Sequence, residues 1–197
     1  EGITRFLLYL LKGLIDNFNI IGEIWCYSFN ENDIMIAVNQ IFKSEYYFSK
    51  VKIVTEKNWY KVLNVPFYIR EYPELFDYDG KKDILPFIAK DYSKANCFIN
   101  AIVYLDNVIH TEKNLYIPVH DLIIHEYYND FIERDSIYKS VFIDVHSKVE
   151  ILARNGAFFL CNSKYVYNEH LLKYIKNIDV KKIEIVYLPF NETFYLS

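Results

Sequence analysis

The sequence predicts a single α+β domain over residues 1–197, with a central, partly antiparallel sheet and several short helices. Hydrophobic residues make up 52% of the chain and charged residues 24%, which is the ordinary balance of a globular domain with its own core. Segments with helical spacing and segments with strand-like spacing follow each other irregularly, and several are joined by hairpin-like turns. This irregular order favours a mixed sheet over a doubly wound parallel one.

The first part of the chain predicts two helices and three strands. Residues 4–17 predict a helix because Phe6, Leu10 and Leu14 recur on one apolar face, and residues 17–19 are expected to end it. Residues 20–29 predict a strand. The elements expected next are a helix over residues 34–42, a short strand over residues 51–55 and an edge strand at residues 62–67, where Pro66 removes a ladder donor.

The remaining elements alternate less regularly. Asp79-Gly80 is typical of a tight turn. A near-continuous apolar run over residues 96–105 predicts a buried strand. A helix is expected over residues 121–134, and further strands are expected over residues 115–119, 137–145, 157–161 and 182–188.

Two more helices are indicated by their capping residues. Ser147 and Glu150 have the spacing of a capping box, which predicts a helix that ends near Arg154. Gly156 follows where a left-handed cap is wanted. Asn168 can cap a helix that runs through residue 175.

Composition and charge exclude several function classes. The net charge of −4 disfavours a polyphosphate or nucleic-acid partner. The five glycines are too dispersed to form a phosphate-binding loop. The acidic residues lack the spacing of a calcium loop, so no metal site is expected and no cofactor can be named.

Cysteine content and hydropathy predict a cytoplasmic protein. Cys26, Cys97 and Cys161 form an odd, widely spaced set, which fits buried thiols in a reducing compartment. No apolar run reaches the ~18 residues of a membrane span. Because the chain begins with Glu1, we expect it to be a piece of a longer protein.

One group of polar residues has the composition of a catalytic site. Asp121 and His125 are four residues apart, so they share a face of the predicted helix, and Glu126 follows directly. A carboxylate beside an imidazole can fix its tautomer and tune a general base, which suggests a hydrolase. The alternative is a solvated acidic helix with a weak Asp–His pair.

Aromatic residues make up 18% of the chain, with 19 Tyr and 15 Phe. Codon bias in an A/T-rich genome and core packing account for much of this content. Tyr and Phe are also enriched at protein interfaces. If residues 46–48, Tyr127-Tyr128 or Trp25 face solvent, they indicate a surface for a protein partner or for self-association.

Three stretches, taken in order, resemble the FRG domain family. Residues 2–7, with Gly2, Thr4 and Arg5, are similar to its Gly-x-Pro-Thr-Arg-Leu-Leu-Asp stretch, and residues 22–27 are similar to its Gly-Ala-Val-Trp strand. Residues 151–158 resemble its Ile-x-Ala-Gln-x-Gly-x-Phe stretch, with Arg154 in the place of Gln. The Phe-Arg-Gly signature itself is not in this chain.

The resemblance implies an accessory or effector domain of bacteria, phages or mobile elements, often tied to defence. It also implies a nucleotide-related or ADP-ribosyltransferase-like role. Thr4-Arg5 and Arg154-Asn155-Gly156 would then be the ligand-binding residues, because a guanidinium beside a glycine turn can hold an anion bidentately. The structural alternative is that Arg154 is a last-turn cation and Gly156 a helix cap.

Three functions are therefore expected, in this order. The first is a non-catalytic interaction or regulatory domain, since no complete catalytic constellation is present. The second is an enzyme acting on a nucleotide or NAD, with Arg5 and Arg154 as phosphate clamps. The third is a hydrolase in which His125 acts as base with Asp121 or Glu126.

Overall fold

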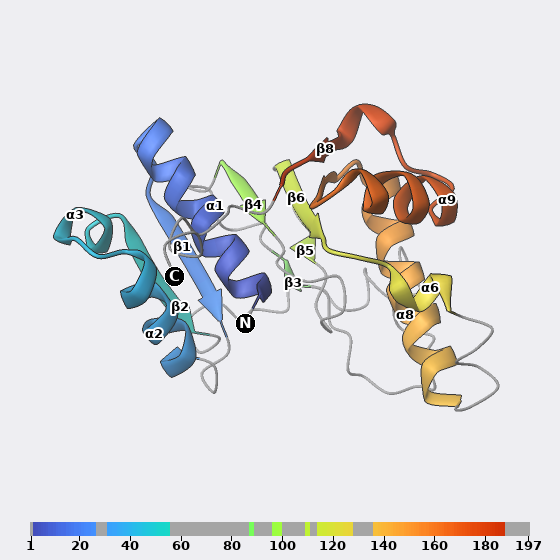
Figure 1. Ribbon diagram of the computed structural model, residues 1–197, viewed down its shortest axis with the longest axis horizontal. Coiled ribbons are helices and arrows are strands. Elements are labelled where there is room, and N and C mark those ends of the chain that lie inside the picture. Colours follow the sequence, from blue (N-terminus) through green and yellow to red (C-terminus); the bar gives the residue numbers. More distant parts are fainter. Residues whose placement is uncertain are drawn as a thin grey trace, which may run out of the picture. The chain divides into compact units, whose positions relative to one another are not determined.

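The computed structural model describes residues 2–26, 31–55, 87–88, 96–99, 109–110, 114–127 and 136–187 (Figure 1). The chain divides into two compact units. Of the described residues, 2–55 belong to the first unit and 87–187 to the second, and each unit is described by itself.

The first unit pairs two parallel strands with three helices. Its elements are α1 (Gly2–Phe18), β1 (Gly22–Cys26), α2 (Glu31–Ile41), α3 (Glu45–Phe48) and β2 (Val51–Thr55). β1 and β2 are paired from Gly22↔Val51 to Cys26↔Thr55. Both helices predicted here, and both strands, are confirmed.

A compact apolar core holds the first unit together. Leu8 and Ile15 of α1 are buried against Val38 and Phe42 at the end of α2. α1 ends as expected: Asn19 adopts a left-handed φ of 50° and donates its amide to the Ile15 carbonyl at 2.9 Å. Asn tolerates this conformation better than most residues, which explains its place after the helix.

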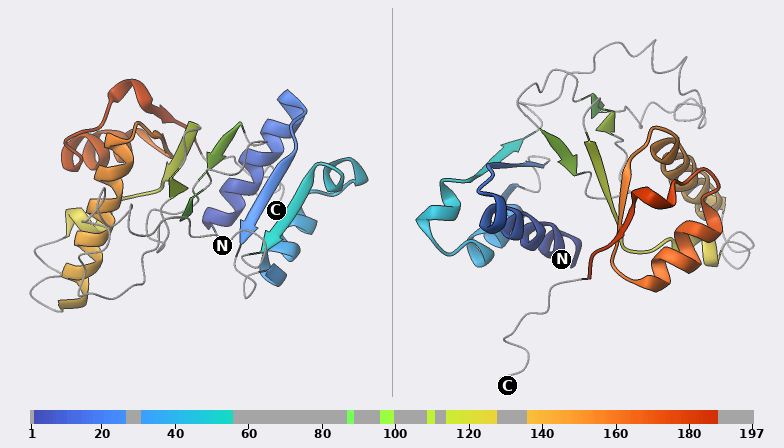
Figure 2. Two further views of the ribbon diagram at one scale, coloured as in Figure 1. Left: turned by 180° about the vertical axis from the view of Figure 1, so that it is seen from behind. Right: turned by 90° about the horizontal axis from the view of Figure 1, so that it is seen from above.

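The second unit contains a four-stranded parallel sheet. Its order is β4-β6-β7-β8, with β4 (Cys97–Ile99), β6 (Asn114–Val119), β7 (Phe158–Cys161) and β8 (Ile183–Ile185). The short strands β3 (Phe87–Ile88) and β5 (Ile109–His110) form a separate parallel pair. Figure 2 shows these strands from two further sides.

Helical segments connect the strands of the second unit. α6 (Ile123–Glu126) and α8 (Ser136–Arg154) lie between β6 and β7. The connection from β7 to β8 contains the π-helical turn η3 (Val166–Leu171), α9 (Leu172–Tyr174) and the 3₁₀ turn η4 (Val180–Lys182). The core of this unit includes side chains that are at most 1% exposed, among them Ile117, Val119, Phe159, Val149 and Leu171.

The prediction of an α+β domain with a partly antiparallel sheet is wrong. Every strand pair within the described part of the chain is parallel. Parallel neighbours need a crossover of a dozen or more residues, usually helical, and residues 120–157 and 162–182 supply such crossovers. The irregular spacing of the elements suggested hairpins, but the helices between the strands carry the chain back to the same end of the sheet.

Two local predictions fail at α8. Residues 137–145, predicted as a strand, lie in this helix, and Ser147 lies inside it rather than capping its start. The alternation that suggested a strand is overridden by a helical apolar face: Val145, at the end of the predicted strand, is buried together with Val149 and Leu152, at spacings of four and three. Helical burial therefore overrides strand propensity here.

The end of α8 is as predicted. The helix ends at Arg154, and Gly156 follows with a left-handed φ of 78°. The Ala157 amide donates to the Leu152 carbonyl at 3.0 Å, and the Gly156 carbonyl accepts a 2.7 Å hydrogen bond from Lys182 Nζ. The strands predicted at residues 115–119 and 157–161 are confirmed by β6 and β7, and β8 lies within the predicted strand 182–188.

One further prediction is wrong, and several others lie partly or wholly outside the described residues. Asn168 lies inside η3 and begins no helix; instead the Ser163 hydroxyl accepts from the Val166 amide at 3.2 Å, as an N-cap residue does. Within residues 121–134 the described part holds α6 only. The edge strand at 62–67, the turn at Asp79-Gly80 and residues 100–105 lie outside the described residues.

We expect Gly156→Ala to lower the free energy of unfolding by about 1–2 kcal/mol, because its positive φ strains an L-residue. A Cβ there would also lie 2.6 Å from Lys182 Nζ. Gly13→Ala is the matched control: a Cβ at this position inside α1 meets nothing within 4 Å, so stability should rise by up to about 1 kcal/mol. Urea unfolding measures both, and equal effects of the two substitutions would contradict this account.

Candidate functional site

Parallel pairing brings polar residues together at the carboxyl ends of β6 and β7. The register aligns Val119 with Cys161, the last residues of the two strands. His120 and Asp121 follow β6, and Asn162 and Ser163 follow β7, so all four lie at one edge of the sheet. In open parallel α/β sheets, ligands bind at the carboxyl edge, most often where the strand order reverses. The order β4-β6-β7-β8 shows no reversal here, so the edge alone identifies these residues. We call these four residues the carboxyl-edge cluster.

Two members of the carboxyl-edge cluster shape the chain locally. The Asp121 carboxylate accepts a hydrogen bond from the Ile123 amide at 3.3 Å, which helps to begin α6. The Ser163 hydroxyl caps the helical segment after β7. Asp121, predicted to face His125 as its carboxylate partner, thus contacts the backbone at the start of α6.

The other two members are uncharged hydrogen-bonding groups. Oδ1 of Asn162 is buried, and no donor reaches it from the part of the chain that the structure describes. His120 is half-buried, and burial lowers the pKa of its imidazole while Asp121 opposes the shift. The ring is therefore neutral at neutral pH. A buried acceptor without a donor costs free energy, so Asn162 would gain from a ligand that supplies a donor.

His125 lies in a buried cluster of rings behind this edge. Its side chain is 6% exposed, with Nε2 3.1 Å from Nδ1 of His146. Its ring packs against Phe142 and Tyr174, with centroids 4.6 and 5.3 Å away. Burial, with His146 and His170 adding to it, lowers the pKa of His125 to about 4. The hydrolase hypothesis needs a base that reaches the substrate, and this imidazole faces other protein rings instead.

Hydrogen bonding favours one tautomer of His125. Its Nδ1 is buried and meets no partner among the described residues. A bare lone pair is cheaper to bury than an unpaired N–H. We therefore assign the proton of His125 to Nε2, from which it donates to Nδ1 of His146.

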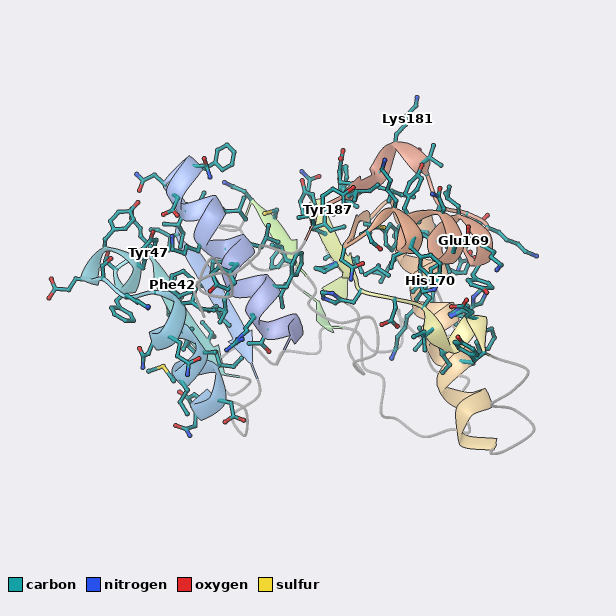
Figure 3. All side chains as sticks on the ribbon, viewed as in Figure 1. Phe42, Tyr47, Glu169, His170, Lys181 and Tyr187 are labelled. Atoms are coloured by element: carbon teal, nitrogen blue, oxygen red, sulfur yellow. The ribbon has the colours of Figure 1, made fainter. Side chains whose placement is uncertain are left out.

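Glu126, the third predicted catalytic residue, is held by two side chains of the helical segment after β7. The Tyr165 hydroxyl donates to one carboxylate oxygen at 2.9 Å, and Nε2 of His170 lies 3.4 Å from the other. These hydrogen bonds lower the pKa of Glu126. The carboxylate is therefore ionised at neutral pH and is a weak base. Figure 3 labels His170, whose ring lies beside α6.

The predicted phosphate clamp is divided between the two units. Thr4 and Arg5 lie in α1 of the first unit, where Arg5 is exposed. Arg154, Asn155 and Gly156 lie at the end of α8, before the amino end of β7 and thus away from the carboxyl-edge cluster. A helix C-terminus carries partial negative charge, so it favours the cation Arg154 and disfavours a bound anion.

The described residues also bear on Cys97, Cys161 and the search for a metal site. Cys161 is buried, and burial raises the pKa of its thiol to about 12, so it is no nucleophile at neutral pH. Cys97 is a free thiol that is exposed, contrary to prediction. Within the described ranges no three His, Cys, Asp or Glu side chains gather as a metal site, and no helix has the length and hydropathy needed to cross a bilayer.

No protein-family model, curated protein or solved structure matches this chain. Function must therefore be argued from the site itself.

Sequence reasoning missed Asn162, Tyr165 and His170. Asn162 follows a predicted strand. If the sheet had been predicted parallel, Asn162 would have been a candidate, because ligands bind at the carboxyl ends of parallel strands. Tyr165 and His170 carry no such signal, because their partners Glu126 and Leu122 are distant in the sequence.

We expect His125→Phe to flatten the acid dependence of stability. A pKa lowered from 6.5 to about 4 means that the folded state binds this proton less readily than the unfolded chain. Stability is therefore full above pH 6.5 and falls by about 3 kcal/mol as the pH drops to 4. Phe keeps the ring contacts and removes the charge, so most of this loss should disappear in urea unfolding between pH 7 and 4.

Leu171→Ala provides the control for His125→Phe. Leu171 is fully buried near this cluster but does not titrate, so its truncation should lower stability by about the same amount at every pH. An unchanged pH slope in His125→Phe would contradict the buried neutral imidazole.

Proposed function

We propose that this chain is a non-catalytic binding domain whose second unit holds a small, uncharged polar ligand at the carboxyl-edge cluster. The observation that carries the proposal is the buried Oδ1 of Asn162, which lacks a donor among the described residues and lies at the edge where parallel α/β sheets bind ligands. A hydroxyl or amide N–H of a ligand would supply that donor.

The composition of the cluster supports a ligand with hydroxyl or amide groups rather than a phosphate. It offers one carboxylate, one amide, one hydroxyl and one imidazole that burial keeps neutral. These groups both donate to and accept from hydroxyls, whereas phosphate sites use guanidinium or ammonium groups. The cluster itself holds no guanidinium or ammonium group. The nearest cation in sequence is the exposed Lys164, which follows Ser163, and Arg154 precedes the opposite end of β7. We therefore rank the nucleotide-enzyme reading lower.

The contacts of the three predicted catalytic side chains support binding without catalysis by them. Among the described residues, the three predicted catalytic side chains are engaged otherwise: His125 is buried against rings, and Glu126 is held as a carboxylate. Asp121 accepts from a backbone amide. A regulatory or defence-related role in a bacterial, phage or mobile-element protein is proposed on the FRG resemblance. A cytoplasmic location is proposed on the free thiols Cys97 and Cys161.

Four probes test the ligand class: adenosine and maltose are neutral and rich in hydroxyls, while glucose is a smaller version and ADP adds phosphates. We expect at least one neutral probe to raise the melting temperature and to shift the amide resonances of residues 120–121 and 162–163. Asn162→Ala should weaken its binding by about tenfold, the worth of one hydrogen bond to a buried acceptor.

Asn168→Ala is the matched control, because Asn168 is exposed within η3 and its substitution should not affect binding. Asn162→Ala should fold with stability close to that of the parent chain. Binding of ADP alone, with loss in Arg154→Ala, would favour the nucleotide reading instead. No shift with any of the four probes would count against a ligand at this edge.

A second candidate function, self-association through the first unit, is favoured by one group of exposed apolar side chains. Phe18, the last residue of α1, and Ile21, which follows the helix, are 71% and 72% exposed. Tyr46 and Phe48 of α3 are 47% and 46% exposed, and the Tyr46 hydroxyl donates to Asn19 at 3.3 Å, which joins α3 to the end of α1. Large apolar groups gathered on one surface are typical of interfaces.

Light scattering with size-exclusion chromatography tests this surface. We expect a dimer or larger species that Phe18→Ser with Ile21→Ser shifts toward monomer. Val180→Ser, which alters an apolar side chain that is 53% exposed in the second unit, should not change the mass. A strict monomer at high micromolar concentration would exclude self-association.

A further inference from the structure

One hydrogen bond joins the turn after β6, next to the carboxyl-edge cluster, to the helical segment after β7. The amide of Leu122 donates to Nδ1 of His170 at 2.8 Å, across 48 positions of sequence. Both residues are buried, since Leu122 is 0% and His170 2% exposed. An imidazole nitrogen accepts only when it carries no proton, so Nδ1 of His170 is bare and its proton lies on Nε2.

The second nitrogen of the His170 ring is also held in place. Nε2–H points to the Glu126 carboxylate, 3.4 Å away, and the Tyr165 hydroxyl holds the second oxygen of that carboxylate. A histidine oriented by a carboxylate on one nitrogen presents the other in a defined direction. Here that direction is the backbone of the turn that follows β6.

That turn carries two members of the carboxyl-edge cluster. Leu122 directly follows His120 and Asp121, and its amide is the group that His170 holds. We propose that His170 is a positioning residue that fixes the turn bearing His120 and Asp121, and that protonation of its Nδ1 releases this turn. The effect of this release on ligand binding rests on the proposed function. The release of the turn itself is independent of that function.

The release follows from geometry. With a proton on Nδ1, two N–H groups face each other at the 2.8 Å separation of the present hydrogen bond. The Leu122 amide then loses its acceptor in a buried place, which is unfavourable unless the ring or the turn moves. Histidine is the side chain whose charge ordinarily changes between about pH 5 and 8.

Several titratable groups lie near His170. The Glu126 carboxylate of α6 lies 3.4 Å from its Nε2. His125 of α6, which is neutral, contacts His146 of α8 in the adjoining cluster of rings. Tyr165 and Tyr174, from the same helical segment as His170, face its ring with centroids 5.2 and 6.4 Å away.

NMR of the free, isotope-labelled chain tests the inference without a ligand. Between pH 8 and 5, the Leu122 amide resonance should titrate together with the His170 ring, and its hydrogen exchange, corrected for the intrinsic pH effect, should accelerate at least tenfold. In His170→Asn, the amide oxygen takes the place of Nδ1 as acceptor but binds no proton. The Leu122 amide should then stay protected and independent of pH. His170→Phe should expose it already at pH 8.

Two controls keep the result specific. The far-UV circular dichroism must stay constant down to pH 5, which separates local release from unfolding. His125→Phe should still show the Leu122 titration, because it leaves His170 in place. A Leu122 amide that does not titrate in the parent chain, or that titrates equally in His170→Asn, would overturn the inference.

Binding of adenosine and maltose forms a separate arm. We expect affinity for a neutral probe to fall about tenfold from pH 8 to 5 in the parent chain and to stay constant in His170→Asn. If Leu122 titrates as described but neither probe binds at any pH, the ligand proposal fails while the role of His170 stands. If a probe binds equally at both pH values although Leu122 titrates, the link between turn and site is refuted.

Discussion

Parallel pairing of β6 with β7 is the constraint on which the rest of the second unit depends. Because Val119 is level with Cys161, both strands end at one edge, and the residues that follow them meet there. The same pairing demands a long crossover, which α8 supplies with a buried face that includes Val145 and Val149. The carboxyl-edge cluster and the helix behind the sheet are thus two consequences of one register.

The histidines of this unit serve the architecture more than the chemistry. His125, His146 and His170 come from α6, α8 and η3, and their contacts tie these three elements together. A buried imidazole is tolerated only when it stays neutral or gains a counter-charge. His125 stays neutral by burial, and His170 has the Glu126 carboxylate beside it. Stability in this region therefore depends on His125 staying neutral, a condition that a core of Leu and Phe would not impose.

Sequence reasoning succeeded where the cause is local and failed where it is distant. The apolar face of α1 and the left-handed Gly156 each depend on a few neighbouring residues, and both were predicted. Strand direction depends on where a crossover of many residues returns, which no local pattern encodes, so the parallel sheet was missed. The bond from Leu122 to His170 spans 48 positions, and neither residue is unusual in its own neighbourhood.

The two edges of the second sheet differ in charge, and this difference supports the proposed class of ligand. At the amino edge, the carbonyls that end α8 are complemented by cations, since Lys182 Nζ donates to the Gly156 carbonyl and Arg154 lies in the last turn. At the carboxyl edge, Asp121 is the one charged member of the cluster, and Asn162 and His120 are neutral. An anion entering there would meet a carboxylate and no complementary cation in the cluster, whereas hydroxyl groups would find both donors and acceptors. The composition of the cluster therefore supports the proposal of a neutral polar ligand at this edge.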